Sequence, residues 1–299
     1  MTQHLLERPE RTERLERLMI IDIHTHTFPE RIAAGTIDKL SRTAHIKPFT
    51  DGTEKQLLAS MEQAGVDLSV IIPVATAARQ VEKVNDASAR LNEVYHGKGL
   101  FSFGCMHPEY EGWHEELARI RDLGLKGIKL HPVYQGADID DIRFLRIIER
   151  AASLGLIVIT HSGLDVGFPG VVHCSPKMCR HVVDEIGSFP FILAHMGGWR
   201  NWDEVPEYLA ETGVYLDTAF STEQITPLPD GYWNGKDLQM LDQDGFLKLL
   251  NAFTADRILF GTDCPWSSQA ESIAFIRKLP IPEEAKEKIL GGNAEKLLN

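Results

Sequence analysis

The sequence predicts an α/β protein with the (β/α)₈ architecture of a TIM barrel. Short apolar runs alternate with amphipathic segments, eight such runs can be identified, and 299 residues is an ordinary length for this fold. Many of the runs are apolar at both even and odd positions, as in parallel strands that are buried on both faces. A doubly wound open sheet shows the same alternation, but no glycine-rich loop follows the first run.

The predicted strands are short and rich in β-branched residues. In chain order they occupy residues 19–24, 69–75, 99–106, 127–131, 156–161, 190–195, 214–218 and 258–263. Amphipathic patterns typical of helices lie between them, at residues 57–65, 81–95, 113–124, 142–155, 178–187, 205–213 and 246–253. Some of these patterns end in glycine just before the next strand, where a left-handed helix cap is expected.

Two long connections interrupt the regular alternation. One runs from the first strand to about residue 53, and the other follows residue 218 and is rich in aromatic residues and proline. Long connections at one end of a barrel commonly cover the substrate, so we predict loops of that kind here.

Residues 1–18 are predicted to form a charged extension outside the barrel. They contain four Glu and four Arg in alternation, which is typical of a solvated helix or tail. Residues 19–299 are predicted to form a single barrel domain. We expect the extension to carry no chemistry.

The composition indicates a soluble globular protein that acts on a small molecule. Hydrophobic residues make up 43% and charged residues 25%, and 31 Lys+Arg against 43 Asp+Glu give a net charge of −12. This acidity disfavours binding to nucleic acid or anionic membrane surfaces. No apolar run reaches the roughly 18 residues of a membrane span, and four irregularly spaced cysteines are typical of reduced thiols. We therefore expect a cytoplasmic protein.

Residue types that bind metals gather at the ends of the predicted strands. In chain order these residues are His24, His26, Lys129, His131, His161, His195 and Asp263. The carboxyl ends of barrel strands meet at one mouth, and residues two apart in a strand point the same way. Imidazole nitrogens with a carboxylate suit Zn²⁺ best, with Mn²⁺, Fe²⁺ or Co²⁺ as alternatives. The pattern therefore predicts a divalent metal site at the mouth.

The motifs DIHTHTFPE, GIKLHP, ITHSG, LAHMGG, FGTDCPW and ILGGNAEKLL resemble the amidohydrolase superfamily. The nearest branch is the amidohydrolase-related group that includes aminocarboxymuconate-semialdehyde decarboxylase-like enzymes, and the resemblance covers about residues 19–299. It implies a barrel of the metal-dependent hydrolase type whose divalent ion is held by His24, His26, His161 and Asp263. It also implies that His195 lies beside the ion as general base or electrophile, and that Asp263 orients the attacking water.

Two alternatives stay open for Lys129. In two-metal members of the superfamily, a lysine at this place is carboxylated and bridges both ions, and His161 and His195 then complete the set. Otherwise its ammonium binds a substrate carboxylate or pairs with a neighbouring acid, and we favour this alternative. His131 and Arg200 are further candidates for contact with the substrate, Arg200 through a bidentate bond to a carboxylate.

We expect a hydrolase that cleaves an amide, ester or lactone bond of a small carboxylated substrate through a metal-activated water. The same site suits a nonoxidative decarboxylase, and related decarboxylases often complete their pockets across a dimer, so a homodimer is one expected assembly. A barrel-type deoxyribonuclease is disfavoured by the net charge and by Lys129, where a glutamate would be expected. A purely structural metal is disfavoured by His195, since closed structural sites keep no adjacent base.

Overall fold

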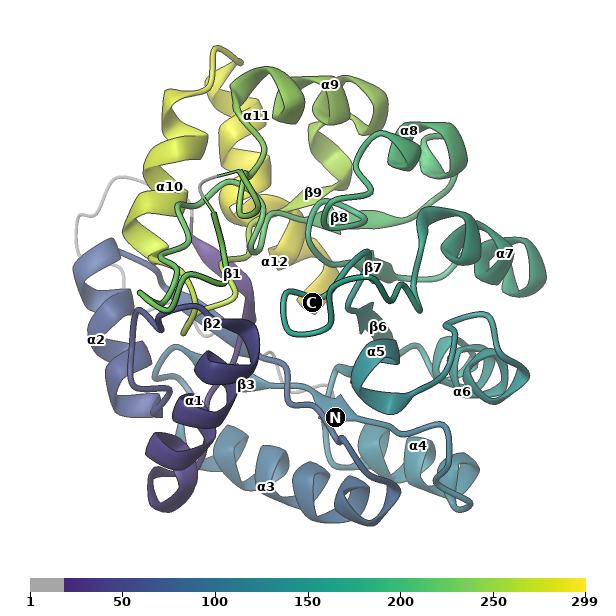
Figure 1. Cartoon of the computed structure of the whole chain (residues 1–299). Helices are drawn as coiled ribbons and strands as arrows, with labels where there is room; N and C mark the ends of the chain where they lie inside the picture. Colours follow the sequence, from purple (N-terminus) through teal and green to yellow (C-terminus); the bar gives the residue numbers. More distant parts are fainter. Residues whose placement is uncertain (1–18, 235) are drawn as a thin grey trace, which may run out of the picture.

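The computed structural model describes residues 19–234 and 236–299, so the predicted extension over residues 1–18 lies outside the described residues. Helices surround a ring of short strands, and Figure 1 shows the ring nearly end-on. The strands are β1 (Ile21–Thr25), β2 (Leu68–Ile71), β3 (Leu100–Ser102), β4 (Gly104–Cys105), β5 (Gly127–Leu130), β6 (Ile157–Thr160), β7 (Phe191–Leu193), β8 (Tyr215–Asp217) and β9 (Ile258–Leu259).

Backbone hydrogen bonds close this ring into a barrel. Parallel pairing joins β1, β2 and β3 in one sheet and β4 to β9 in another. Between β3 and β4, the N–H of Phe103 donates to the carbonyl of Ile71 at 2.9 Å, so the two short strands act as one interrupted strand. Between β1 and β9, the N–H of Ile23 donates to the carbonyl of Phe260, the residue after β9, at 2.9 Å. The described residues therefore give eight strand positions, as the sequence predicts.

Helices cover the outside of the barrel. They are α1 (Glu30–Ala44), α2 (Glu54–Ala64), α3 (Val81–Val94), α4 (Trp113–Asp122), α5 (Pro132–Gln135), α6 (Ile142–Ser153), α7 (Pro176–Ile186), α8 (Glu204–Leu209), α9 (Gln243–Phe253), α10 (Gln269–Lys278), α11 (Glu283–Glu287) and α12 (Asn293–Leu298). Side chains that accept hydrogen bonds from the first turn begin five of them, at Thr53, Asp141, Ser175, Asp242 and Ser268. No helix among the described residues is long and apolar enough to cross a membrane.

Apolar side chains fill the barrel, so its interior is a packed core. Ile21, Ile23, Phe103 and Ile159 belong to this core, and Leu298 is also part of it. Figure 1 shows α12, which carries Leu298, behind the ring. Crowding explains the glycine that begins β5. A Cβ at Gly127 would lie 2.6 Å from the carbonyl oxygen of Ile157 and 2.7 Å from the ring of Phe103. The interior therefore cannot accept a side chain there.

The prediction of a loop between β1 and residue 53 is wrong for α1. This helix follows Pro29 without a side-chain cap and ends at His45 in the left-handed conformation, so it lacks the usual start and stop residues. The chain after α1 pairs with the other long connection. Lys47 N–H donates to the carbonyl of Thr226, and Leu228 N–H to that of His45, each at 2.8 Å. The two long connections thus lie together, as expected of segments that cover a mouth.

Candidate metal centre

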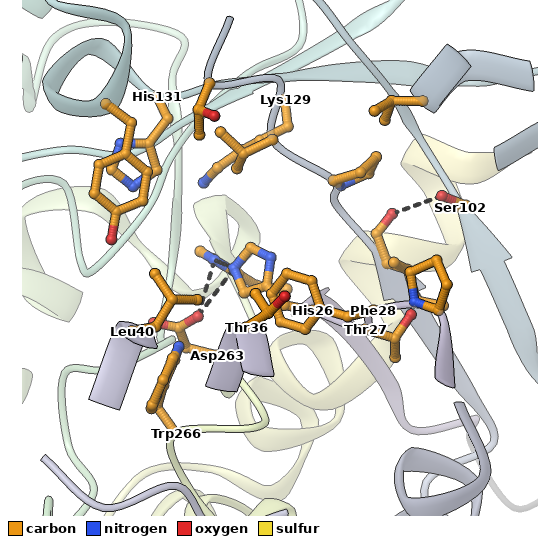
Figure 2. A pocket seen from close by; sticks show the side chains of 18 of the residues that line it. His26, Thr27, Phe28, Thr36, Leu40, Ser102, Lys129, His131, Asp263 and Trp266 are labelled. Carbon is orange, nitrogen blue, oxygen red and sulfur yellow. Dashed lines mark hydrogen bonds and ion pairs between the residues drawn. The ribbon is translucent and has the colours of Figure 1, made fainter. Parts of the chain in front are cut away.

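One cavity of about 1150 Å³ lies at the carboxyl ends of the strands. Most of the predicted site residues line it, and Figure 2 shows Lys129, His131, His26 and Asp263 around the same space. The predicted residues that line the cavity are His24, His26, Lys129, His131, His161, His195 and Asp263. The sequence therefore located the mouth correctly.

Three of these residues form a compact group that we name the first cluster: His24, His26 and Asp263. The Nε2 atoms of the two histidines are 3.2 Å apart, and Asp263 Oδ1 lies 3.1 Å from His26 Nε2 and 3.5 Å from His24 Nε2. Two ligands at 2.0–2.2 Å from a tetrahedral ion are roughly 3.3–3.6 Å apart. The imidazole planes cross at 80°, so in-plane lone pairs of both rings can meet at one point. The first cluster fits a divalent ion.

An irregularity in β1 and a buried carboxylate orient His24. The register of β1 against β2 shifts between Asp22 and Thr25, and a bulge of this kind redirects a side chain. Asp217 accepts from the N–H groups of His195 and Ala219 at 3.0 and 3.1 Å through Oδ1. Its Oδ2 lies 2.8 Å from His24 Nδ1. When Nδ1 carries the hydrogen and donates it to Asp217, the lone pair of Nε2 points toward the first cluster. Carboxylates fix metal-binding histidines in this way in known metal sites.

A second group, which we name the second cluster, consists of His131, His161 and Asp165, all buried. Asp165 Oδ2 lies 3.6 Å from His131 Nε2 and 3.9 Å from His161 Nε2. The two imidazoles are stacked, with centroids 4.4 Å apart and planes only 14° from parallel. Lone pairs that lie in nearly parallel planes run side by side and do not converge on one ion. The second cluster is therefore a poor metal site as it stands.

His161 and His195 face each other through nitrogens that carry no hydrogen. His195 Nδ1 lies 2.9 Å from the carbonyl of Ala219, and His161 Nε2 lies 3.1 Å from that of Leu164. Because a carbonyl only accepts, both of these nitrogens must donate. Burial lowers the pKa of both imidazoles, that of His195 to about 4, so both are neutral at pH 7.

Their remaining nitrogens, His195 Nε2 and His161 Nδ1, are 3.0 Å apart and both present a lone pair. Two lone pairs at this distance repel each other, and a cation bound by His161 Nδ1 or a proton accepted by His195 Nε2 would relieve that repulsion. This arrangement suits the roles that the resemblance implies for His161 and His195. It favours a base over an electrophile for His195, since a lone pair cannot donate to a carbonyl.

Backbone strain also marks this region. His195 and Asp263 have φ angles of 61° and 63°, in the left-handed region that non-glycine residues rarely adopt. Each lies just after a strand, where the chain turns sharply at the mouth. Strain of this kind costs energy and is frequent at functional sites, but Arg200 and Thr254 share the conformation without lining the cavity, so it does not by itself assign a role.

Lys129 is buried at 1% exposure, and its amine points into the cavity (Figure 2). Burial lowers its pKa to about 8, opposed by the carboxylates of Asp217 and Asp263. Within the described part of the chain, no side chain forms an ion pair or hydrogen bond with it. A buried cation without a fixed partner is costly, and an anionic ligand would remove that cost.

Of the two other predicted substrate contacts, His131 lies in the cavity and Arg200 does not. His131 lines the cavity, stacked on Tyr134 with centroids 4.0 Å apart, so it is placed to contact a substrate. Arg200 does not line the cavity: it is exposed, and its guanidinium lies 3.5 Å from the carbonyl of Gln239. The chain turns at Arg200, where φ is 66°, and the side chain leaves the mouth.

Sequence reasoning missed Asp217 and Asp165. Asp217 ends the apolar strand β8, and a carboxylate at a strand end was the signal that could have identified it. Asp165 lies in an irregular segment four residues after His161, and only the folded chain brings it to the second cluster.

The sequence matches the family model described as amidohydrolase over residues 21–299. No curated protein matches it. Among solved structures, an uncharacterized TIM-barrel protein from Bordetella bronchiseptica has a TM-score of 0.71 and 21% identity, with 94% of this chain and 98% of that chain covered.

Two decarboxylases are also similar. For 5-carboxyvanillate decarboxylase from Sphingomonas paucimobilis the TM-score is 0.66 at 17% identity, covering 94% of this chain and 99% of that chain. For dihydroxybenzoic acid decarboxylase from Polaromonas sp. JS666, whose structure holds manganese, the TM-score is 0.64 at 16% identity, covering 94% of this chain and 97% of that chain. At these identities, the likeness shows a shared fold.

Proposed function

Because the chain belongs to the amidohydrolase family, we propose that it is a metal-dependent hydrolase of a small carboxylated molecule, cleaving an amide, ester or lactone bond. The observation that supports this proposal best is that the first cluster and Lys129 line the same cavity. One side of the cavity suits a divalent ion, and the other presents a buried ammonium without a partner. A substrate that combines a cleavable carbonyl with a carboxylate would satisfy both.

His24, His26 and Asp263 would hold the ion, and His161 would complete the set through Nδ1. When bound, the ion supplies positive charge that acidifies water and polarises a carbonyl. Zn²⁺ is our first choice because imidazoles dominate the ligand set, while the neighbour from Polaromonas holds manganese.

The chain's own residues would orient the substrate and move the protons. His195 Nε2 has a lone pair that can accept a proton from the attacking water, and the bond from Nδ1 to Ala219 fixes its ring. Asp263 would orient the water, and the proton that His195 accepts would pass from its Nε2 to the leaving group. Lys129 would bind the substrate carboxylate, a contact that is the same in the ground state and the transition state.

Nonoxidative decarboxylation is the second candidate, and the activities of the two similar decarboxylases favour it. The cavity wall also includes Trp199, Phe220 and Trp266, which suit an aromatic acid. In that reaction the carboxylate beside Lys129 would itself leave as CO₂, and a proton would replace it on carbon.

An isotope experiment separates the two reactions. Metal-loaded protein would be incubated in H₂¹⁸O with carboxylated amides, esters and lactones and, separately, with aromatic acids. We expect one ¹⁸O atom in a product of the first group, and loss of that label in Asp263→Asn. The exposed variant Lys278→Gln serves as the control and should behave like wild type. Release of CO₂ from an aromatic acid, without hydrolysis of the first group, would replace the proposal by the second candidate.

A further inference from the structure

The cavity does not end at the metal centre. It continues into an arm between α1 and α3, two helices that lie on the same side of the barrel in Figure 1. The residues of α1 that line it recur at helical spacing, as do those of α3, so one face of each helix borders the arm. These residues include Gly35 and Thr36 on α1 and Ala87 and Ser88 on α3, whose small side chains leave room between the helices.

The arm is positively charged in an otherwise acidic protein. Four cations line it, Arg31 and Lys39 from α1 and Lys83 and Arg90 from α3, against one carboxylate, Glu54. All four are exposed, and none makes an ion pair or side-chain hydrogen bond within residues 19–234 and 236–299. The whole chain carries a net charge of −12, so this concentration of unpaired positive charge runs against its composition.

The cations extend along the arm. Arg31 and Lys39 are eight residues apart, roughly 12 Å along a helix axis, and Lys83 and Arg90 are roughly 10 Å apart. Apolar side chains line the same arm, among them Ile32 at 45% and Val94 at 58% exposure. The whole cavity also exceeds the roughly 300–1,000 Å³ of ordinary small-molecule sites. A small acid bound at Lys129 would leave the arm empty.

We propose that the arm binds the phosphate-bearing tail of an elongated substrate whose reacting head lies at the metal centre. The inference rests on the proposed function for the head, and it names the class of the tail. Arginine and lysine both bind phosphate oxygens, and four cations suit several negative charges better than a single carboxylate. The apolar residues would contact the chain that joins head and tail.

Titration of the full-length protein with inorganic pyrophosphate, followed by calorimetry, tests the arm. We expect Lys39→Gln/Lys83→Gln to bind pyrophosphate about tenfold more weakly than wild type, because two charged contacts are lost. Arg31→Gln/Arg90→Gln should show a similar loss. The matched control is Arg277→Gln/Lys278→Gln, which removes two exposed cations of α10 that do not line the cavity, and it should bind like wild type.

The variant His24→Ala tests whether pyrophosphate binds in the arm or at the metal centre. We expect this variant to bind pyrophosphate as wild type does. Loss of binding in His24→Ala would place the anion on the metal and overturn the proposal. Equal binding by both arm variants and wild type, equal loss in the α10 control, or no binding by wild type would also overturn it. The assay measures no turnover, so failure of the proposed hydrolysis would leave its result unchanged.

Discussion

The first and second clusters have the same composition and line the same cavity, yet their geometries differ. Each contains two histidines and one aspartate. In the first cluster the imidazole planes cross at 80°, and the three ligand atoms lie 3.1 to 3.5 Å apart. In the second the planes are 14° from parallel, and the aspartate lies 3.6 and 3.9 Å from the imidazoles. Ring orientation, and not residue type, makes the first cluster the better candidate for a metal site.

Strand geometry explains the difference. His131 and His161 follow neighbouring parallel strands at the same level, since Leu130 of β5 is paired with Thr160 of β6. Side chains at equivalent positions of adjacent strands lie side by side, and these two rings therefore stack. His24 and His26 come from one chain segment whose register shifts at a bulge, and this turns their rings across each other.

The largest expected effect comes from removing a ligand of the first cluster. His24→Ala should lose the ion and the activity together, because the remaining ligand atoms cannot hold a divalent ion tightly. His131→Ala, the matched change in the second cluster, should keep its metal. Metal content of the purified proteins measures both. A fully loaded His24→Ala protein would break the distinction between the clusters.

His195→Ala should keep its metal but lose turnover by roughly 10²–10⁴-fold, the usual contribution of a group that transfers protons. The physical reason is that, in the proposed mechanism, its Nε2 lone pair would accept a proton while His161 Nδ1 would bind the ion. Metal content and kcat, measured on the same preparation, test this division. If the variant lost metal as well, His195 would be a ligand and two ions would be indicated.

Asp217→Asn should weaken metal binding by about 10–100-fold, since the carboxylate that orients a metal-bound histidine usually contributes that much. The fold should persist because an amide fills the same space. Competition with a chelator measures the affinity. Asp203→Asn, which alters an exposed carboxylate, is the control, and equal affinity in both variants would remove Asp217 from the centre.

The smallest effect is expected for Lys129→Gln. It should raise KM for carboxylated substrates about tenfold and leave kcat and metal content near wild type, because it removes uniform binding. Steady-state kinetics on the hydrolysed substrate provides the test. A fall in kcat would favour decarboxylation, and a fall from two ions to one would show that a carboxylated lysine bridges two metals.

Much of this architecture was predictable from the sequence because strand ends in a barrel converge. Knowing that His24, His26 and Asp263 end strands was sufficient to place them at one mouth. The second cluster was not predictable, since Asp165 reaches it through an irregular segment and the stacking of His131 on His161 depends on register. Arg200 was predicted to contact the substrate because it follows β7, but the chain turns there in the left-handed conformation and the side chain lies outside the cavity.

Anomalous diffraction from crystals of the zinc-loaded protein would test the central claim most directly. The account predicts one ion per chain, contacted by His24 Nε2, His26 Nε2, Asp263 and His161 Nδ1, with Lys129 unmodified. An ion between His131 and Asp165, or a second ion beside Lys129, would contradict it.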